Sequence, residues 1–127
     1  MTLFLCDTHV IVWAAATPER LRPETREVLA DTSQVALVSS VSVAEMVIKI
    51  ASGKLSLPLS PMELCERMGF GELTLSWRHA ERVHGLAPIH RDPFDRLLIA
   101  QAMEEDLTLI TADAIVASYK GVRIQQA

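Results

Sequence analysis

Short apolar runs without alternating polar residues recur along the chain, and the clearest of them end abruptly at a polar residue. Runs of this kind are typical of strands that are buried on both faces of a parallel sheet. Three of them stop at Asp7, Ser39 and Thr111. We predict strands at Leu3–Cys6, Val35–Val38, Leu73–Leu75, Leu107–Ile110 and Val122–Ile124.

Between the predicted strands, apolar residues recur at the three- and four-residue spacing of helices. The segment that follows Asp92 carries the strongest signal, because Asp92 suits an N-cap and Pro93 suits the first helical position. Apolar residues then continue to Met103. The other predicted helices cover Val10–Ala15, Pro23–Ala30, Val43–Ala51, Pro61–Gly69 and Trp77–His84, with a short one after Asp113.

Strands that alternate with helices predict an α/β fold, in which helices cover both faces of a mostly parallel sheet. The length of 127 residues fits one hydrophobic core, and half of the residues are apolar, which is enough to build it. No repeat or low-complexity segment divides the chain. We therefore expect one domain over residues 1–127.

The sequence also carries information about the cellular location of the protein. The two cysteines, Cys6 and Cys65, are too few for a disulfide framework and lack metal-ligand spacing, so we expect both to be reduced and buried. The first residues lack the pattern of a signal peptide, and no run approaches the roughly 20 apolar residues of a membrane span. We expect a cytoplasmic protein without a membrane partner.

The formal net charge of −4 argues against a protein that binds nucleic acid through a broad basic face. This argument fails if several of the 16 acidic residues surround a divalent cation, because the cation reverses the local field. The distribution of the acidic residues therefore matters more than their number.

Four acidic residues lie where the predicted sheet would bring them together. Asp7 and Asp113 follow strands, and Glu45 and Asp95 lie near the starts of helices. Ligands of open parallel sheets bind beyond the carboxyl ends of the strands. Carboxylates gathered there repel one another unless a hard cation neutralises them. Mg²⁺, for which Mn²⁺ could substitute, suits such ligands and can activate water for attack on a phosphodiester.

Two of these positions also have a structural interpretation based on helix spacing. Ser42-x-x-Glu45 has the spacing of a capping box, and Glu45 with Lys49 has that of an i,i+4 ion pair. Asp95 could simply favour the positive end of its helix. Asp92 is better explained as an N-cap than as a metal ligand, so we place it in a supporting role.

The remaining two acids could be helix caps. Asp113 could cap the short helix that follows Thr111, whereas Asp7 could act as a cap only if a helix begins at Thr8. His9 could contact substrate or be structural, and the other three histidines lack the spacing of a zinc site. The candidates for substrate contact or for support of the acids are Thr8, His9, Lys49, Arg91, Asp92, Arg96 and Thr111, with Lys54 as a further cation.

Five motifs in order along nearly the whole chain resemble the PIN-domain toxins of the VapC type. The stretch around Asp92-Pro93-Phe94-Asp95 is the most specific of them. The motifs are Leu5-Cys6-Asp7-Thr8-His9, Ser39-x-x-Ser42-x-x-Glu45-x-x-Ile48-Lys49, Gly53-Lys54-Leu55, His90-Arg91-Asp92-Pro93-Phe94-Asp95-Arg96-Leu97-Leu98-Ile99-Ala100-Gln101-Ala102 and Leu109-Ile110-Thr111-Ala112-Asp113.

The resemblance implies a three-layer α/β/α sandwich and a metal-dependent endoribonuclease, the toxin of a type II toxin–antitoxin pair. Asp7, Glu45, Asp95 and Asp113 match the acidic positions of the family. It further implies a homodimer and a hetero-oligomer with an antitoxin protein. Before Glu45, where many relatives carry Trp, this chain has Val43-Ala44, which changes the packing or the wall of the groove.

Two other functions are compatible with parts of the pattern. An Asp after the first strand could be the covalent nucleophile of a phosphatase, but dehalogenase-type phosphatases carry a second Asp where this chain has His9. Alternatively, the domain could bind a partner or RNA without cutting, because the presence of acidic residues does not establish activity.

Overall fold

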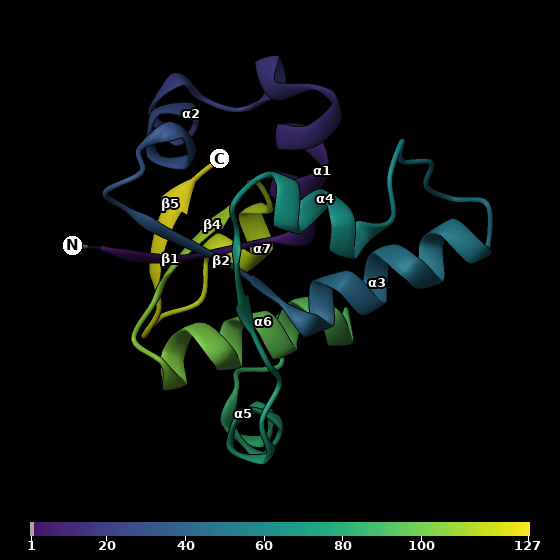
Figure 1. Cartoon of the computed structure of the whole chain (residues 1–127). Helices are drawn as coiled ribbons and strands as arrows, with labels where there is room; N and C mark the ends of the chain where they lie inside the picture. Colours follow the sequence, from purple (N-terminus) through teal and green to yellow (C-terminus); the bar gives the residue numbers. More distant parts are fainter. Residues whose placement is uncertain (1) are drawn as a thin grey trace.

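The computed structural model describes residues 2–127 and contains a five-stranded sheet in the order β3-β2-β1-β4-β5. Every neighbouring pair of strands is parallel. Figure 1 shows this twisted sheet at the centre of the molecule with helices around it. The strands are β1 (Leu3–Cys6), β2 (Val35–Ser39), β3 (Gly71–Leu73), β4 (Thr108–Thr111) and β5 (Arg123–Gln126).

The helices lie on both faces of the sheet, as the alternation of strands and helices predicts. They connect parallel strands, since a parallel strand can be reached only by a crossover. The helices are α1 (Thr8–Ala16), α2 (Pro23–Ala30), α3 (Ser40–Ala51), α4 (Pro61–Arg67), α5 (Trp77–Arg82), α6 (Pro93–Glu104) and α7 (Ala114–Ala117), with 3₁₀ turns η1 (Pro18–Arg20) and η2 (Val83–Gly85).

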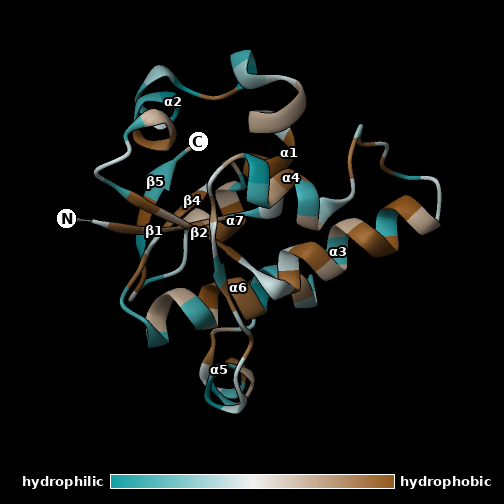
Figure 2. Ribbon diagram, viewed as in Figure 1, coloured by the Kyte–Doolittle hydropathy of each residue, from teal (hydrophilic) through white to brown (hydrophobic). Residues whose placement is uncertain are grey.

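Two hydrophobic cores lie on opposite faces of the sheet, because successive side chains of a strand point in opposite directions. Along β1, Phe4 and Cys6 belong to one core and Leu5 to the other. The first core also receives α1, α2 and α4, and the second receives α6 and α7. Figure 2 shows the apolar residues concentrated on the central strands. The predicted three-layer α/β/α arrangement is therefore confirmed.

Several predicted boundaries were wrong by two or three residues. The third strand ends at Leu73 instead of extending to Leu75, and the last strand continues to Gln126. The helix predicted to reach His84 ends at Arg82 and continues as the 3₁₀ turn η2. Such shifts are expected at element ends, where hydrogen bonding to neighbouring strands decides the boundary.

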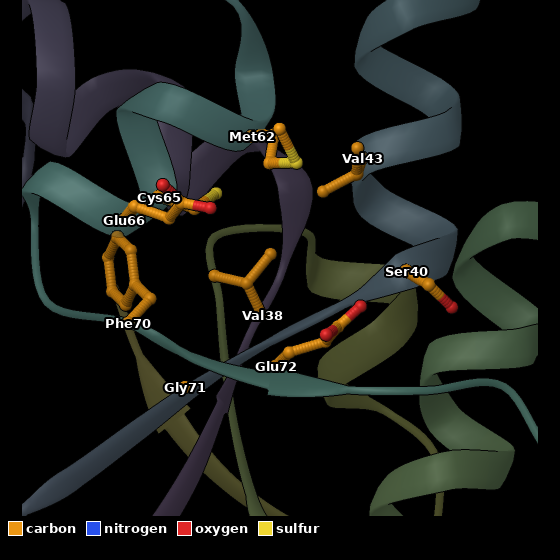
Figure 3. Close-up of a pocket in the computed structure, with 9 residues that line it drawn as sticks. All are labelled: Val38, Ser40, Val43, Met62, Cys65, Glu66, Phe70, Gly71 and Glu72. Atoms are coloured by element: carbon orange, nitrogen blue, oxygen red, sulfur yellow. The ribbon is translucent and has the colours of Figure 1, made fainter.

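A cavity of about 240 Å³ lies beside β2 and β3, bordered by α3 and α4 (Figure 3). Val43, at the position where the sequence departs from the family that it resembles, lines this cavity together with Phe70 and Gly71. Cys6 and Cys65 are buried, as predicted, and neither is in a disulfide. Within residues 2–127, no helix is long and apolar enough to span a bilayer.

Gly71 starts β3 where the backbone approaches its neighbour closely. A Cβ atom at this position would lie 2.8 Å from Leu37 Cδ2 on β2. We expect Gly71→Ala to lower the free energy of unfolding by about 1 kcal/mol or more, because overpacking displaces the Leu37 side chain. Urea unfolding would measure this loss. Gly85→Ala is the matched control, since a Cβ there would meet no atom within 4 Å; equal losses in the two variants would contradict the packing argument.

Candidate active site

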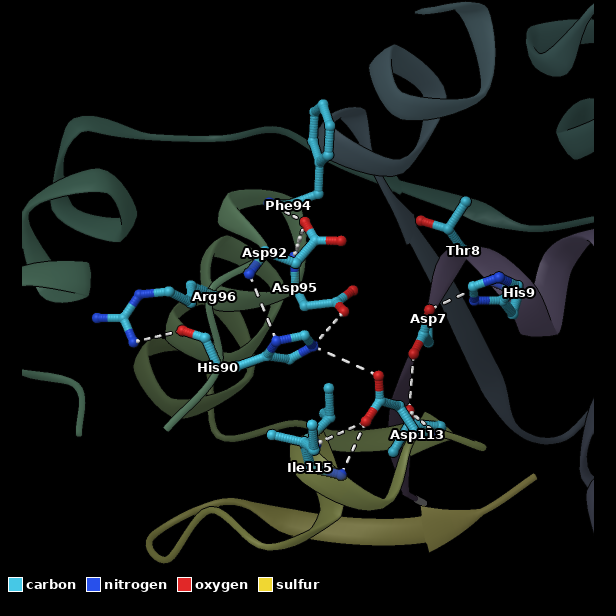
Figure 4. A network of polar contacts seen from close by, with 12 residues as sticks. Asp7, Thr8, His9, His90, Asp92, Phe94, Asp95, Arg96, Asp113 and Ile115 are labelled. Carbon is cyan, nitrogen blue, oxygen red and sulfur yellow. Dashed lines mark hydrogen bonds and ion pairs between the residues drawn. The ribbon is translucent and has the colours of Figure 1, made fainter. Parts of the chain in front are cut away.

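The four predicted acids are placed at the carboxyl edge of the sheet by four separate segments. Asp7 directly follows β1, and its backbone N–H extends the pairing by donating to Ile110 O at 2.9 Å. Asp113 follows β4, Glu45 lies in the helix after β2, and Asp95 lies in the first turn of α6. Figure 4 shows three of them, with Asp7 on one side and Asp95 and Asp113 around His90.

Asp7 is a buried carboxylate and also the N-cap of α1, which begins at Thr8. Its Oδ1 accepts a hydrogen bond from the His9 backbone N–H at 3.2 Å, and its Oδ2 accepts one from the Thr111 hydroxyl at 2.7 Å. Burial raises the pKa of Asp7, and these two hydrogen bonds only partly oppose that effect. Burial therefore makes the negative charge of Asp7 less favourable than in water, and a nearby cation would offset this cost.

Glu45 is buried in α3, where its two oxygens have different partners. The Thr8 hydroxyl donates to Oε1 at 2.7 Å, and Lys49 Nζ donates to Oε2 at 2.5 Å. The predicted i,i+4 ion pair with Lys49 is confirmed. The capping-box interpretation was wrong, because the helix begins three residues earlier, with Ser39 as its N-cap. Ser42 lies inside the helix, and its Oγ is 3.0 Å from the Thr8 hydroxyl.

Asp92 is the N-cap of α6, as the sequence predicted. Its Oδ1 accepts hydrogen bonds from the backbone N–H groups of Phe94 at 2.8 Å and Asp95 at 3.4 Å. The side chain of Asp95 is therefore not needed as a cap. It lies next to His90, whose Nε2 is 2.7 Å from Asp95 Oδ2.

Asp113 has both a structural and a site-facing oxygen. Oδ1 caps α7 by accepting from the backbone N–H groups of Ile115 at 2.7 Å and Val116 at 3.2 Å. Oδ2 lies 3.3 Å from His90 Nε2. The capping interpretation of Asp113 is thus correct, and it leaves one oxygen directed to His90.

His90 is a site residue that the sequence did not single out. One ligand atom each from His90, Asp95 and Asp113 lie within 4.8 Å of one another. The His90 Nε2 atom is buried, and neither of its carboxylate contacts has hydrogen-bond geometry. On the other side of the ring, the Asp92 backbone N–H donates to Nδ1 at 3.4 Å. His90 and Asp95 are close in the sequence, so their contact could be expected from it. The contact between His90 and Asp113 depends on the fold.

The electrostatics of this cluster favour a cation. Burial raises the pKa of Asp95 to about 7, and the charges of Asp7 and Asp92 add to the effect, while His90 opposes it. A divalent ion would offset both the cost of burying the negative charge of Asp95 and its repulsion by the neighbouring acids. Carboxylate oxygens are the donors that Mg²⁺ and Mn²⁺ prefer, so the oxygens of Asp95 and Asp113, which lie within 4.8 Å of each other, fit either ion.

The basic candidates divide into those near the acids and those used elsewhere. Lys49 pairs with Glu45, whereas Arg91 and Lys54 are exposed. His9 is exposed beside Asp7 and stands next to Trp13, with 6.2 Å between ring centroids. Arg96 donates to backbone carbonyls, including Ala87 O at 2.9 Å, so its guanidinium serves the loop before His90.

Comparison with known proteins finds solved structures of the same fold. VapBC2 from Rickettsia felis, solved with a promoter DNA fragment, has a TM-score of 0.74 at 15% identity, and each chain is covered to 98%. VapBC-1 from nontypeable Haemophilus influenzae has a TM-score of 0.69 at 17% identity, again with 98% of each chain covered.

VapBC-5 from Mycobacterium tuberculosis, a member of a family of toxin–antitoxin systems, has a TM-score of 0.61 at 18% identity, over 98% of this chain and 97% of the other. At these identities the likeness establishes the fold. Among curated proteins, none matches the sequence significantly. The sequence profile described as PIN domain matches residues 4–122, which is nearly the whole chain. The chain therefore belongs to the PIN domain family.

Proposed function

We propose that this protein is an Mg²⁺-dependent endoribonuclease and the toxin of a type II toxin–antitoxin pair. PIN domains are generally nucleases, which supports hydrolysis of nucleic acid. The observation that carries the proposal is the group of acids at one edge of the sheet, where Asp7 and Asp95 have raised pKa values. Buried carboxylates of this kind are costly without a cation and useful with one.

Asp7, Glu45, Asp95 and Asp113 are the residues that would hold the ion. When bound, Mg²⁺ would polarise the scissile phosphodiester and make a coordinated water a better nucleophile. The chain's own groups orient the ligands: Thr111 holds Asp7 Oδ2, while Thr8 and Lys49 hold the two oxygens of Glu45. The exposed side chains of His9 and Arg91 are the proposed contacts to RNA.

The proposed partner is an antitoxin protein, because the structural relatives were solved as VapBC toxin–antitoxin complexes. A protein partner also fits the exposed apolar residues Val47, Ile48 and Ile50 along α3. We retain the homodimer and the cytoplasmic location as predictions. The phosphatase alternative is disfavoured, because dehalogenase-type phosphatases carry a second Asp where this chain has His9.

The test is cleavage of a mixed RNA pool by purified protein free of its antitoxin, with Mg²⁺ or with a chelator. We expect cuts that require Mg²⁺ and leave 5′-phosphate and 3′-hydroxyl ends, because a water molecule attacks the phosphorus, the bond to the 3′-oxygen breaks and that oxygen leaves as a hydroxyl. Sequencing of the new ends would identify the RNA that is cut. Cleavage that persists in chelator would contradict the metal-dependent mechanism. RNA binding without cleavage by folded, metal-loaded protein would favour a binding module.

A further inference from the structure

The hydroxyl of Tyr119 connects three segments behind the acid cluster. It accepts hydrogen bonds from the His90 backbone N–H at 2.9 Å and from Arg96 Nη1 at 3.2 Å, and it donates to Ala87 O at 2.9 Å. Tyr119 is itself buried in the core between α6 and the sheet. One hydroxyl group therefore uses its donor and both of its acceptor positions inside the protein.

Arg96 holds the same loop from the side of α6. Its Nη1 donates to Ala87 O at 2.9 Å and to His90 O at 3.4 Å, and its Nη2 donates to Val83 O at 3.3 Å. A guanidinium has several donors in a fixed planar arrangement, so it can hold several carbonyls at once. Lysine, with one compact ammonium, could not reproduce this arrangement.

These contacts lie directly behind the residues that carry the acids. Arg96 is adjacent to Asp95 in α6, and Tyr119 follows the short helix that Asp113 caps. The loop that both side chains contact covers residues 86–92 and contains His90. The Nε2 atom of His90 is 2.7 Å from Asp95 Oδ2 and 3.3 Å from Asp113 Oδ2. Figure 4 shows Arg96 and the acids on opposite sides of the His90 backbone and ring.

The tautomer of His90 follows from its other nitrogen. Because the Asp92 N–H donates to Nδ1, the proton of a neutral ring lies on Nε2, which faces the two carboxylates. The Nε2 atom thus lies between Asp95 Oδ2 and Asp113 Oδ2, close to both carboxylates but without hydrogen-bond geometry to either. The ring fills the space between their Oδ2 atoms, while Asp113 Oδ1 remains the cap of α7.

We propose that Arg96 and Tyr119 are positioning residues, which hold His90 against Asp95 and Asp113 and so set the separation of these two acids for the metal. This inference rests on the proposed function, because it assumes that the acids bind a divalent cation. In this proposal Arg96 binds the backbone carbonyls of the loop that contains His90 and does not contact a phosphate of the substrate.

The test is Mn²⁺ affinity, measured by electron paramagnetic resonance on the full chain without RNA. Tyr119→Phe keeps the buried ring and removes only the hydroxyl, and Arg96→Lys keeps the charge and removes the planar donors. We expect each variant to bind Mn²⁺ about 10-fold more weakly, as is typical when groups that orient metal ligands are removed. Arg123→Lys is the matched control, because Arg123 also donates to a backbone carbonyl, Asp106 O, at a distant turn.

A second measurement separates positioning from general destabilisation. In a His90→Ala background, Tyr119→Phe should cause no further loss of Mn²⁺ affinity, because the hydroxyl acts through His90. Full additivity of the two losses would overturn the inference, and so would unchanged affinity in both Tyr119→Phe and Arg96→Lys. If the variants bind Mn²⁺ as tightly as the wild type does, only the positioning role fails. If the wild type does not bind Mn²⁺, the proposed metal-dependent function fails together with the positioning role.

Discussion

Asp7→Asn should lower the rate of RNA cleavage by at least about 100-fold, more than is typical when a group that merely orients a metal ligand is removed. Asn retains an oxygen that can accept from the His9 N–H at the start of α1, and its amide can donate to the Thr111 hydroxyl. The variant should therefore fold normally, because it loses a buried negative charge and keeps the cap. Single-turnover cleavage at saturating Mg²⁺ measures the loss.

The control for Asp7→Asn is Asp31→Asn, which changes an exposed acid that caps a turn at Ser33. This control should cleave RNA at the wild-type rate. Far-ultraviolet circular dichroism of both variants would establish that they are folded. Wild-type cleavage by folded Asp7→Asn protein would remove Asp7 from the catalytic centre, whereas loss of folding would assign it to the structure of α1.

Asp95→Asn should abolish cleavage and, at neutral pH without metal, raise the thermal stability. The pKa of Asp95 is raised to about 7 in the folded protein, so the folded state binds this proton more tightly than the unfolded state. The stability that results is fully present below about pH 4 and is lost as the pH rises through 7. Because Asn carries no charge, the variant does not lose this stability as the pH rises. Because water screens part of the effect, we expect a gain of about 1 kcal/mol, or about 3–5 °C in Tm.

Differential scanning fluorimetry between pH 5 and pH 8, with and without Mg²⁺, checks this expectation. For the wild type, Mg²⁺ should raise Tm more at pH 8 than at pH 5, because the cation binds the ionised carboxylates. Asp95→Asn should lose most of this response. Glu81→Gln, an exposed change on α5, should respond like the wild type. A metal-independent fall in the stability of Asp95→Asn would indicate a structural role in α6.

The acidic residues illustrate which local contacts can be predicted from the sequence. The cap at Asp92 and the ion pair between Glu45 and Lys49 are local, and both were predicted from spacing alone. The capping box at Ser42 was predicted by the same kind of rule and was wrong. The helix begins earlier because Ser39, at the end of β2, already caps it by accepting from the Val41 N–H at 3.0 Å.

The sequence by itself determined the alternation of buried strands and helices, the parallel sheet and the positions of the acids at strand and helix ends. These features depend on hydrophobic periodicity and local capping, which act over a few residues. Only the tertiary structure decided that His90 lies between Asp95 and Asp113 and that Arg96 binds carbonyls. Those contacts join residues up to 23 positions apart, as from His90 to Asp113, and depend on how loops pack after the sheet has formed.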